Sequence, residues 1–413
     1  PELCRPRALH STHVGIGREA VTSCVALGAA VACVTDEQPP ELVAVEFLDA
    51  STLVLRFSEP IGPIADVVPE THFRVGSALV IDQDGMLMAE GTADAPIVMT
   101  SNSDSPARGD WGGLVLLGDA PTNLGAPGVA EGFVDAPEYG GDDAAHNCGS
   151  LNYLRVEYAG FEISDGNELN GITFYACGSD TEAHYVQSHM GQDDGIEWFG
   201  GGFDADHLVV TGAADDSLDI DQGFQGNIQH VFIHQDPSIG DNCYEISNQG
   251  DDFSATPRTN PIIANATCVG SGSGGDKSKG MTLKEGTNGQ YWNSIITNVT
   301  NEGVLLTHPE SQAEAEAGNI AFAGNVIAGN GIPFGTGSDA TWTGDDVEAW
   351  IAGQAGNILD TAPTFVSTDW GSLDATPAEG SNAIGNGESL PGGFDSTDYS
   401  GAVDPAGDNW TAA

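Results

Sequence analysis

The fold is decided by residues 184–246, which read HYVQSHMGQDDGIEWFGGGFDADHLVVTGAADDSLDIDQGFQGNIQHVFIHQDPSIGDNCYEI. A histidine leading into a short apolar run recurs at His184, His207 and His230, at a spacing of 23 residues. Each run is followed by a polar pair, Asp-Asp or Asp-Asn, and then by a second alternating apolar segment. One such unit cannot bury its apolar side chains alone, whereas stacked units bury a continuous core. The repeat therefore predicts an all-β, right-handed parallel β-helix.

Other repeat architectures fit the period less well. Leucine-rich repeats need a fixed leucine lattice and an asparagine ladder, and propeller blades need about 40 residues or more. Short apolar runs between Gly, Asp and Asn turns begin near residue 75 and fade after 340. We expect four parts: an N-terminal segment (1–38), a β hairpin (39–75), the parallel β-helix (76–340) and an irregular C-terminal cap (341–413).

The two N-terminal parts have different residue patterns. Residues 19–34 (EAVTSCVALGAAVACV) are small and apolar after a basic stretch, which is typical of a secretory signal or of a short packed helix. Residues 41–62 (ELVAVEFLDASTLVLRFSEPIG) alternate strictly and predict two strands. Residues 40–75 resemble the opening of bacterial Ig-like surface modules. The match is too short for a whole sandwich, so the hairpin is either a truncated module or a cap on the coil.

The charge balance limits the partners. The chain has 61 Asp and Glu against 11 Lys and Arg, a net charge of −50. Binding to nucleic acids or to anionic membranes is excluded, because both depend on clustered basic residues. No apolar run is long enough for a transmembrane span. Self-repulsion of this size needs screening by salt or by bound Ca²⁺. An ion-rich extracellular or outer-surface location follows as an expectation.

Cysteine spacing is compatible with disulfides in that location. Cys148 and Cys177, and likewise Cys243 and Cys268, are separated by little more than one repeat, so each pair can lie on neighbouring turns. Buried free thiols are the alternative. The total of seven leaves at least one cysteine unpaired or used between molecules.

Stacking also predicts columns of acidic side chains. Alternation sends Ile196 and Trp198 inward and Glu197 outward, and the next two units repeat this. Carboxylates about 5 Å apart without a cation repel each other, and some of their pKa values rise. Bound Ca²⁺, protons shared in an active site, or solvent and salt screening would each relieve the repulsion. The candidate metal ligands are Asp194, Glu197, Asp216, Asp219, Asp241 and Glu245.

An enzyme is the second hypothesis. Gln192-Asp193-Asp194 resembles a motif of polygalacturonase-type glycoside hydrolases, and Asp193, Asp194, Asp215 and Asp216 on adjacent turns are the candidate acids. The other motifs of those hydrolases are absent. No Lys or Arg occurs between Arg155 and Arg258, so we expect no basic group on this face for a uronate. The histidines at 184, 207 and 230 form a third expected column, for packing rather than for a metal.

Much of the chain is similar to a block found in bacterial right-handed β-helix surface proteins, many of them lipoproteins. The blocks that carry the resemblance are MLMAEGTADAPIVMTSNSDSPARGDWGGLVLLGDAPTN (86–123), HMGQDDGIEWFGG (189–201), HLVVTGAADDSLDIDQGF (207–224) and PGGFDSTDYSGAVDPAGDNW (391–410). The resemblance implies a β-helix with an extracellular address. We expect a structural or adhesive protein that binds Ca²⁺ and self-associates, head to tail or laterally, with a glycan as a further candidate partner.

Overall fold

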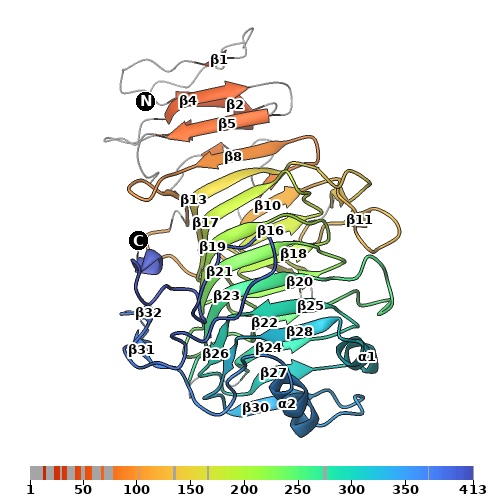
Figure 1. The fold of residues 1–413 in the computed structure, drawn as a ribbon. Helices are drawn as coiled ribbons and strands as arrows, with labels where there is room; N and C mark the ends of the chain where they lie inside the picture. Colours follow the sequence, from red (N-terminus) through yellow and green to blue (C-terminus); the bar gives the residue numbers. More distant parts are fainter. Residues whose placement is uncertain are drawn as a thin grey trace.

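The computed structural model describes residues 78–412, apart from 102, 134–135, 165–166, 273–276 and 371, and the backbone of six strands before residue 78. The chain winds into a coil whose strands stack along one axis (Figure 1). Every strand pair within the coil is parallel. The predicted right-handed parallel β-helix is confirmed. Within the described residues, no helix has the length and apolar character needed to cross a membrane.

Two sheets make up the coil. The short sheet has nine strands. They are β7 (Leu79–Ile81), β10 (Leu114–Leu117), β16 (Ile172–Tyr175), β18 (Ile196–Phe199), β20 (Leu218–Asp221), β22 (Asn242–Ile246), β24 (Lys279–Leu283), β27 (Glu302–Leu306) and β30 (Ile332–Thr336). The coil strands of the long sheet are β8 (Met86–Glu90), β9 (Ile97–Met99), β13 (Gly149–Glu157), β17 (Glu182–His189), β19 (Ala205–Thr211), β21 (Asn227–His234), β23 (Ile262–Val269), β25 (Gly289–Trp292), β26 (Ile295–Thr297), β28 (Ile320–Ala323) and β29 (Val326–Ile327).

The long sheet bends at a row of residues with positive φ. In β13, β17, β19 and β21 these are Tyr153, Tyr185, His207 and His230, and in the next turns Asn265 and Asn293 take the position. We call these six residues the corner column. Residues before and after each bend pair in register with the neighbouring turns, so the coil has three flat faces. The apolar side chains of all three faces meet inside, where Ile196, Leu218 and Trp198 are buried.

At its N-terminal end the coil continues into a hairpin. β4 (Leu42–Phe47) and β5 (Thr52–Phe57) pair antiparallel, as the alternation predicted, and β5 pairs in parallel with β8. The hairpin thus extends the long sheet. Within residues 1–38, β2 (Ser23–Leu27) and β3 (Ala30–Val34) form an antiparallel pair, so the short helix expected there is wrong. Valine, which favours strands, recurs in both segments. The signal-like alternative is not tested. The remaining strands are β1 (His13–Val14) and β6 (Val67–Val68).

The C-terminal part has two roles. The helix α2 (Gly344–Ala352) buries Val347 and Ile351 against the last turn of the coil, and α1 (Pro309–Ala317) lies beside it (Figure 1). Residues 386–412 instead return along the outer face of the long sheet, far beyond a simple cap. Within this segment Glu388 bonds to Asn293, Asp395 to Gln229 and Tyr399 to Asn265. We call residues 358–412 the C-terminal strap. It contains β31 (Phe365–Ser367), β32 (Asp374–Pro377) and the 3₁₀ turn Trp410–Ala412.

An insertion covers part of the short sheet. Residues 118–148, with the small hairpin β11 (Gly128–Val129) and β12 (Glu138–Tyr139), fold back over its outer face. Tyr139 packs on Tyr175 with ring centroids 4.5 Å apart, and Tyr175 stacks on Phe199 at 4.5 Å. A smaller hairpin, β14 (Glu162–Ser164) and β15 (Asn167–Glu168), lies in the turn before β16. The outer face is therefore apolar beside the first turns.

Both predicted disulfides are present. Cys148–Cys177 joins the connections that lead from β10 and β16 into the long sheet, which are neighbouring turns. Cys243 in β22 and Cys268 in β23 are fully buried, so the second disulfide crosses the interior between the two sheets. The other three cysteines lie outside the residues whose side chains are described.

Replacing both Cys243 and Cys268 by Ala should destabilise the coil. The bond closes a loop with a sequence separation of 25 residues, and loss of that restraint on the unfolded chain costs about 3 kcal/mol. Urea unfolding of the double variant and of the native chain measures the difference. The two proteins should converge when both are unfolded under reducing conditions, and a difference that persists there would point to packing instead.

Candidate cation-binding face

The acidic residues occupy one edge and the outer face of the short sheet. Glu197, Asp219 and Glu245 pair directly across β18, β20 and β22, as predicted. We call the acidic face the set of eight carboxylates carried by these turns. They are Asp193, Asp194, Glu197, Asp215, Asp216, Asp219, Asp241 and Glu245.

A hydrogen-bonded ladder holds one edge of this face. Asn170 Oδ1 accepts from the backbone N–H of Asp194 (3.3 Å), and Asp194 Oδ1 accepts from that of Asp216 (2.8 Å). Asp216 Oδ1 then accepts from the backbone N–H (2.6 Å) and the side-chain amide (2.8 Å) of Asn242. Four successive turns thus carry one rung each, Asn170, Asp194, Asp216 and Asn242. One oxygen of each aspartate is fixed by the fold.

Several of these carboxylates are buried, although they lie outside the coil. Asp194, Glu197 and Asp216 are 7%, 6% and 5% exposed. Screening by solvent, one of the three outcomes considered from the sequence, therefore does not reach them. Asp219 Oδ1 is buried and has no hydrogen-bond partner among the described residues. A buried oxygen of this kind costs free energy unless it is protonated or bound to a cation.

Burial and mutual repulsion shift the acidities together. Burial, and then the Asp215 carboxylate, raises the pKa of Asp193 to about 8. Burial and the neighbouring carboxylates raise the pKa of Asp194, Asp216 and Asp219 well above the usual range. Burial followed by Glu131, on the covering insertion, does the same to the pKa of Glu197. At neutral pH the acidic face thus favours bound protons or a bound cation.

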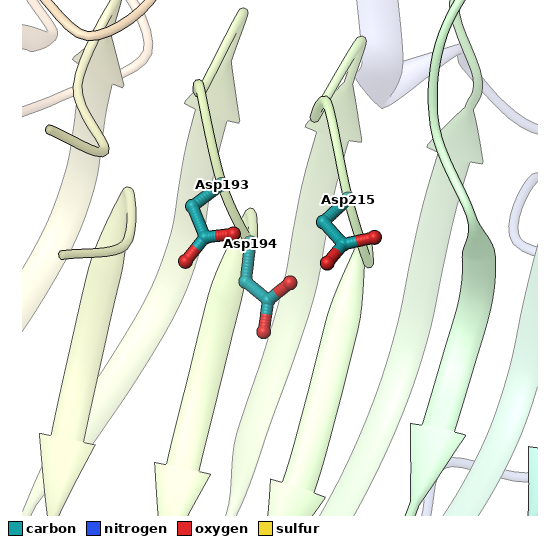
Figure 2. Close-up of side chains that lie close together, drawn as sticks. All are labelled: Asp193, Asp194 and Asp215. Carbon is teal, nitrogen blue, oxygen red and sulfur yellow. The ribbon is translucent and has the colours of Figure 1, made fainter. Parts of the chain in front are cut away.

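The carboxylates fall into groups that could hold a metal ion. Asp193, Asp194 and Asp215 each bring one oxygen within 4.8 Å of the others (Figure 2). Asp215, Asp216 and Asp241 do the same on the next turn, and Asp215, which both groups share, is exposed. Two further groups, built on Asp219 with Asp194 and Glu197 or with Asp216 and Glu245, lie deeper. Since all donors are carboxylate oxygens, the set suits Ca²⁺ better than zinc or copper.

The sequence wrongly predicted a face without basic groups. Lys279, on β24, donates to Asp241 Oδ1 at 2.5 Å, and Lys284 forms an ion pair with Glu245. Burial, Asp241 and Glu245 raise the pKa of Asp215, while Lys277 and Lys279 lower it. These lysines come from the next turn of the coil, which is distant in sequence and adjacent in space. They neutralise one end of the acidic face, and none of the described residues places a cationic side chain at its centre.

The geometry bears on two other expectations and corrects the second, the histidine column. Inverting glycosidases place their carboxyl groups about 6.5–9.5 Å apart to admit a water. The nearest oxygens of Asp193, Asp194 and Asp215 lie within 4.8 Å of one another, which is a distance between single oxygens and not between whole carboxyl groups, so the predicted hydrolase pair stays a hypothesis. The three histidines do not form one column, because His184 pairs with Asp206 and Tyr185 takes the place equivalent to His207. The turn from His184 to its partner Asp206 is 22 residues long, whereas the spacing from His184 to His207 is 23.

The structure adds residues that the sequence analysis missed. Asn170 begins the ladder and donates to Glu197, and Asn242 ends the ladder. Glu131 approaches Glu197 and Asp193 from the insertion. Asn170 follows the same spacing before its strand as Asp194, so the repeat itself could have located it. Nothing in the repeat points to Glu131.

Stability without divalent ions should fall as the pH rises. Because the folded-state pKa of Asp193 is raised from 3.8 to about 8, the folded state binds this proton more tightly than the unfolded state. The resulting stability is complete below about pH 4 and is lost as the pH rises through 8. Thermal melting in chelator between pH 5 and 8 measures the slope.

Asp194→Asn should flatten this slope. Asn keeps the oxygen that accepts from Asp216 N–H and removes a buried charge, so the variant should melt above the native chain at pH 8 and approach it at pH 5. Asp94→Asn, in an exposed turn before β9, is the matched control and should melt like the native chain. A native melting temperature that is constant over this range would contradict the charge argument.

Comparisons with known proteins agree with the coil. The family model described as a pectate-lyase-like β-helix domain matches residues 65–354. Among solved structures, the chain is similar to the crystal structure of pectate lyase Pel9A, with 13% identity and a TM-score of 0.36 over 86% of this chain and 87% of that one. That likeness is too distant to carry an argument. No curated protein matches the chain. Because the family model covers well over half of its length, the chain belongs to the family of pectate-lyase-like β-helix domains.

Proposed function

We propose that this chain is an extracellular adhesive β-helix protein that binds Ca²⁺ on its acidic face and holds carboxylated glycans through the ion. The observation that carries the proposal is the group of Asp193, Asp194 and Asp215, whose oxygens lie within 4.8 Å. The described residues place the lysines at the far end of the face, on Asp241 and Glu245. A divalent cation at the centre removes the mutual repulsion of the carboxylates.

The ladder defines which atoms remain for an ion. Asp194 and Asp216 each use Oδ1 for a backbone amide, so the second oxygen of each is available. Asp215 is exposed and gives access from solvent. Ca²⁺ takes six to eight oxygens, more than three carboxylates supply in a monodentate manner. The remaining positions would accept water or the carboxylate of a uronic acid, a ligand that this anionic protein otherwise repels.

Several observations support an extracellular location. Two disulfides persist in an oxidising compartment, and a charge of −50 suits an ion-rich medium. Self-association stays a prediction. α2 covers the C-terminal end of the coil with Val347 and Ile351 buried, so head-to-tail pairing of open strands has no support at that end. The lipoprotein address and the Ig-like character of residues 39–75 also stay predictions.

Calcium should stabilise the protein and should do so through Asp193 and Asp215. At free Ca²⁺ one hundred times above Kd, linkage gives about 2.7 kcal/mol of added stability. Isothermal titration at pH 8 and melting with and without Ca²⁺ measure binding and stabilisation. Asp193→Asn with Asp215→Asn should weaken binding at least tenfold, and Asp94→Asn should not. The proposal would be contradicted if millimolar Ca²⁺ gave neither a heat of binding nor a rise in melting temperature.

A second candidate function is cleavage of a polyuronate by elimination. The observation that favours it is the pair Lys277 and Lys279 beside Asp215, which supplies the basic groups that the sequence analysis had not found. The Lys277 amine would take the C5 proton of a uronate, the freed electron pair would form a C4–C5 double bond, and the C4–O bond would break, while Lys279 stays an ammonium ion on Asp241. The departing oxygen would take a proton from water. Bound Ca²⁺ would supply neutralisation of the uronate carboxylate.

Polygalacturonate with Ca²⁺ tests this candidate. Ultraviolet absorbance of the unsaturated product should rise with time, and the rate should fall at least a hundredfold in Lys277→Gln. Lys284→Gln, whose ammonium group is held by Glu245, is the control and should keep most of the activity. Binding of polygalacturonate without product formation would leave adhesion as the function.

A further inference from the structure

The corner column makes the bend in the long sheet with bulky rings at four turns, which the bend itself does not require, because Asn265 and Asn293 make it in the later turns. Tyr153, Tyr185, His207 and His230 have φ values of 48°, 55°, 54° and 58°. This left-handed conformation is uncommon for non-glycine residues and costs free energy, most of all for bulky side chains. Such strain at successive turns suggests that these side chains have a task at this position.

The lower part of the corner column has an evident task, because it binds the C-terminal strap. His230 Nδ1 lies 3.3 Å from the carbonyl of Ala402. Asn265 donates to the carbonyl of Tyr399, and Asn293 donates to that of Glu388. Among the described strap residues, Trp410 is the one whose ring contacts the rings that precede His230 in the column. Tyr153, Tyr185 and His207 therefore need a separate explanation.

These upper residues form a stack of rings that supports Trp410. Tyr153 and Tyr185 stack at 4.4 Å, Tyr185 and His207 at 4.2 Å, and His207 lies 4.8 Å from His230. Both faces of Tyr185 and of His207 are thus covered, and their edges meet Trp410 at interplanar angles of 83° and 80°. Trp410 Nε1 also donates to the carbonyl of Ala402 at 3.0 Å. The indole plate also packs against the buried cluster that contains Phe232, Val269 and Ala402, so its orientation is fixed and only part of the ring is exposed.

Polar groups surround this plate. Asp206 Oδ2 lies 2.7 Å from His184 Nδ1, and Asp206 Oδ1 lies 2.6 Å from His207 Nδ1. The His184 and Asp206 side chains are 39% and 35% exposed. Both imidazoles use Nδ1, so Nε2 of His184 remains available for a ligand. Burial, then Tyr153 and Asp206, raises the pKa of Tyr185, whose hydroxyl also forms a hydrogen bond with the Tyr153 side chain and can accept one from a ligand.

We propose that this corner is a binding site for a neutral saccharide, with one sugar ring stacked on Trp410 and its hydroxyls bonded to Asp206, His184 and Tyr185. A flat apolar plate beside fixed donors and acceptors matches the apolar face and hydroxyl edge of a pyranose. The net charge of −50 disfavours an anionic glycan here, because the described residues of this corner include no Lys or Arg in contact with the ring stack. The site is separate from the acidic face and needs no metal.

Affinity electrophoresis of the full chain tests the site. Native gels containing galactomannan, xyloglucan, laminarin or dextran are run at pH 7 in chelator, so that failure of the Ca²⁺ proposal leaves the result unaffected. At least one polysaccharide should retard the protein. Trp410→Ala should weaken the retardation at least tenfold, and Asp206→Asn should weaken it severalfold. Trp370→Ala is the matched control, because Trp370 lies on the same strap and packs on His234.

Two further outcomes keep the test decisive. Trp410→Phe retains a flat ring and should restore most of the binding, even if Trp410→Ala loosens the strap and lowers the melting temperature. Loss of binding in both variants would overturn the role of the plate. Retardation by none of the four polysaccharides, or retardation that survives Trp410→Ala, would overturn the proposal itself.

Discussion

Stacking in register is the constraint on which the rest of the molecule depends. Parallel strands about 4.8 Å apart place equivalent residues of every turn in one row. For Ile196, Leu218 and Tyr244 the row is a continuous apolar core. For Glu197, Asp219 and Glu245 the same geometry forces like charges together. The same stacking that stabilises the apolar core therefore destabilises the acidic face, unless protons or cations bind there.

The ladder shows that the charge is not required for the architecture. Asn170 Oδ1 accepts a backbone amide of the ladder as Asp194 Oδ1 and Asp216 Oδ1 do, and Asn242 ends the ladder as a donor to Asp216. Asparagine in all four positions would satisfy the backbone amides without buried charge. Aspartate at the two central rungs therefore adds negative charge where Lys279 and Lys284 do not reach. That excess is best understood as binding capacity rather than as a contribution to stability.

Sequence reasoning succeeded wherever the answer was periodic. The strand order, the inward residues, the pairing of Glu197 with Asp219 and both disulfides follow from the length of one turn. It failed where one residue changes the register, as at His184, or where a partner comes from another turn, as with Lys279. Two further features are long-range contacts without periodicity. The strap returns along the long sheet, and the insertion brings Glu131 near Glu197. No local pattern encodes them.

The covering insertion links burial to affinity. Glu131 approaches Glu197 and Asp193 from residues 118–148, and by itself this contact adds repulsion and desolvation. Both effects destabilise the empty state of the acidic face and strengthen its attraction for a cation, since an ion interacts more strongly at low effective dielectric constant. The ion and the insertion should therefore stabilise each other, because each is bound more tightly when the other is in place.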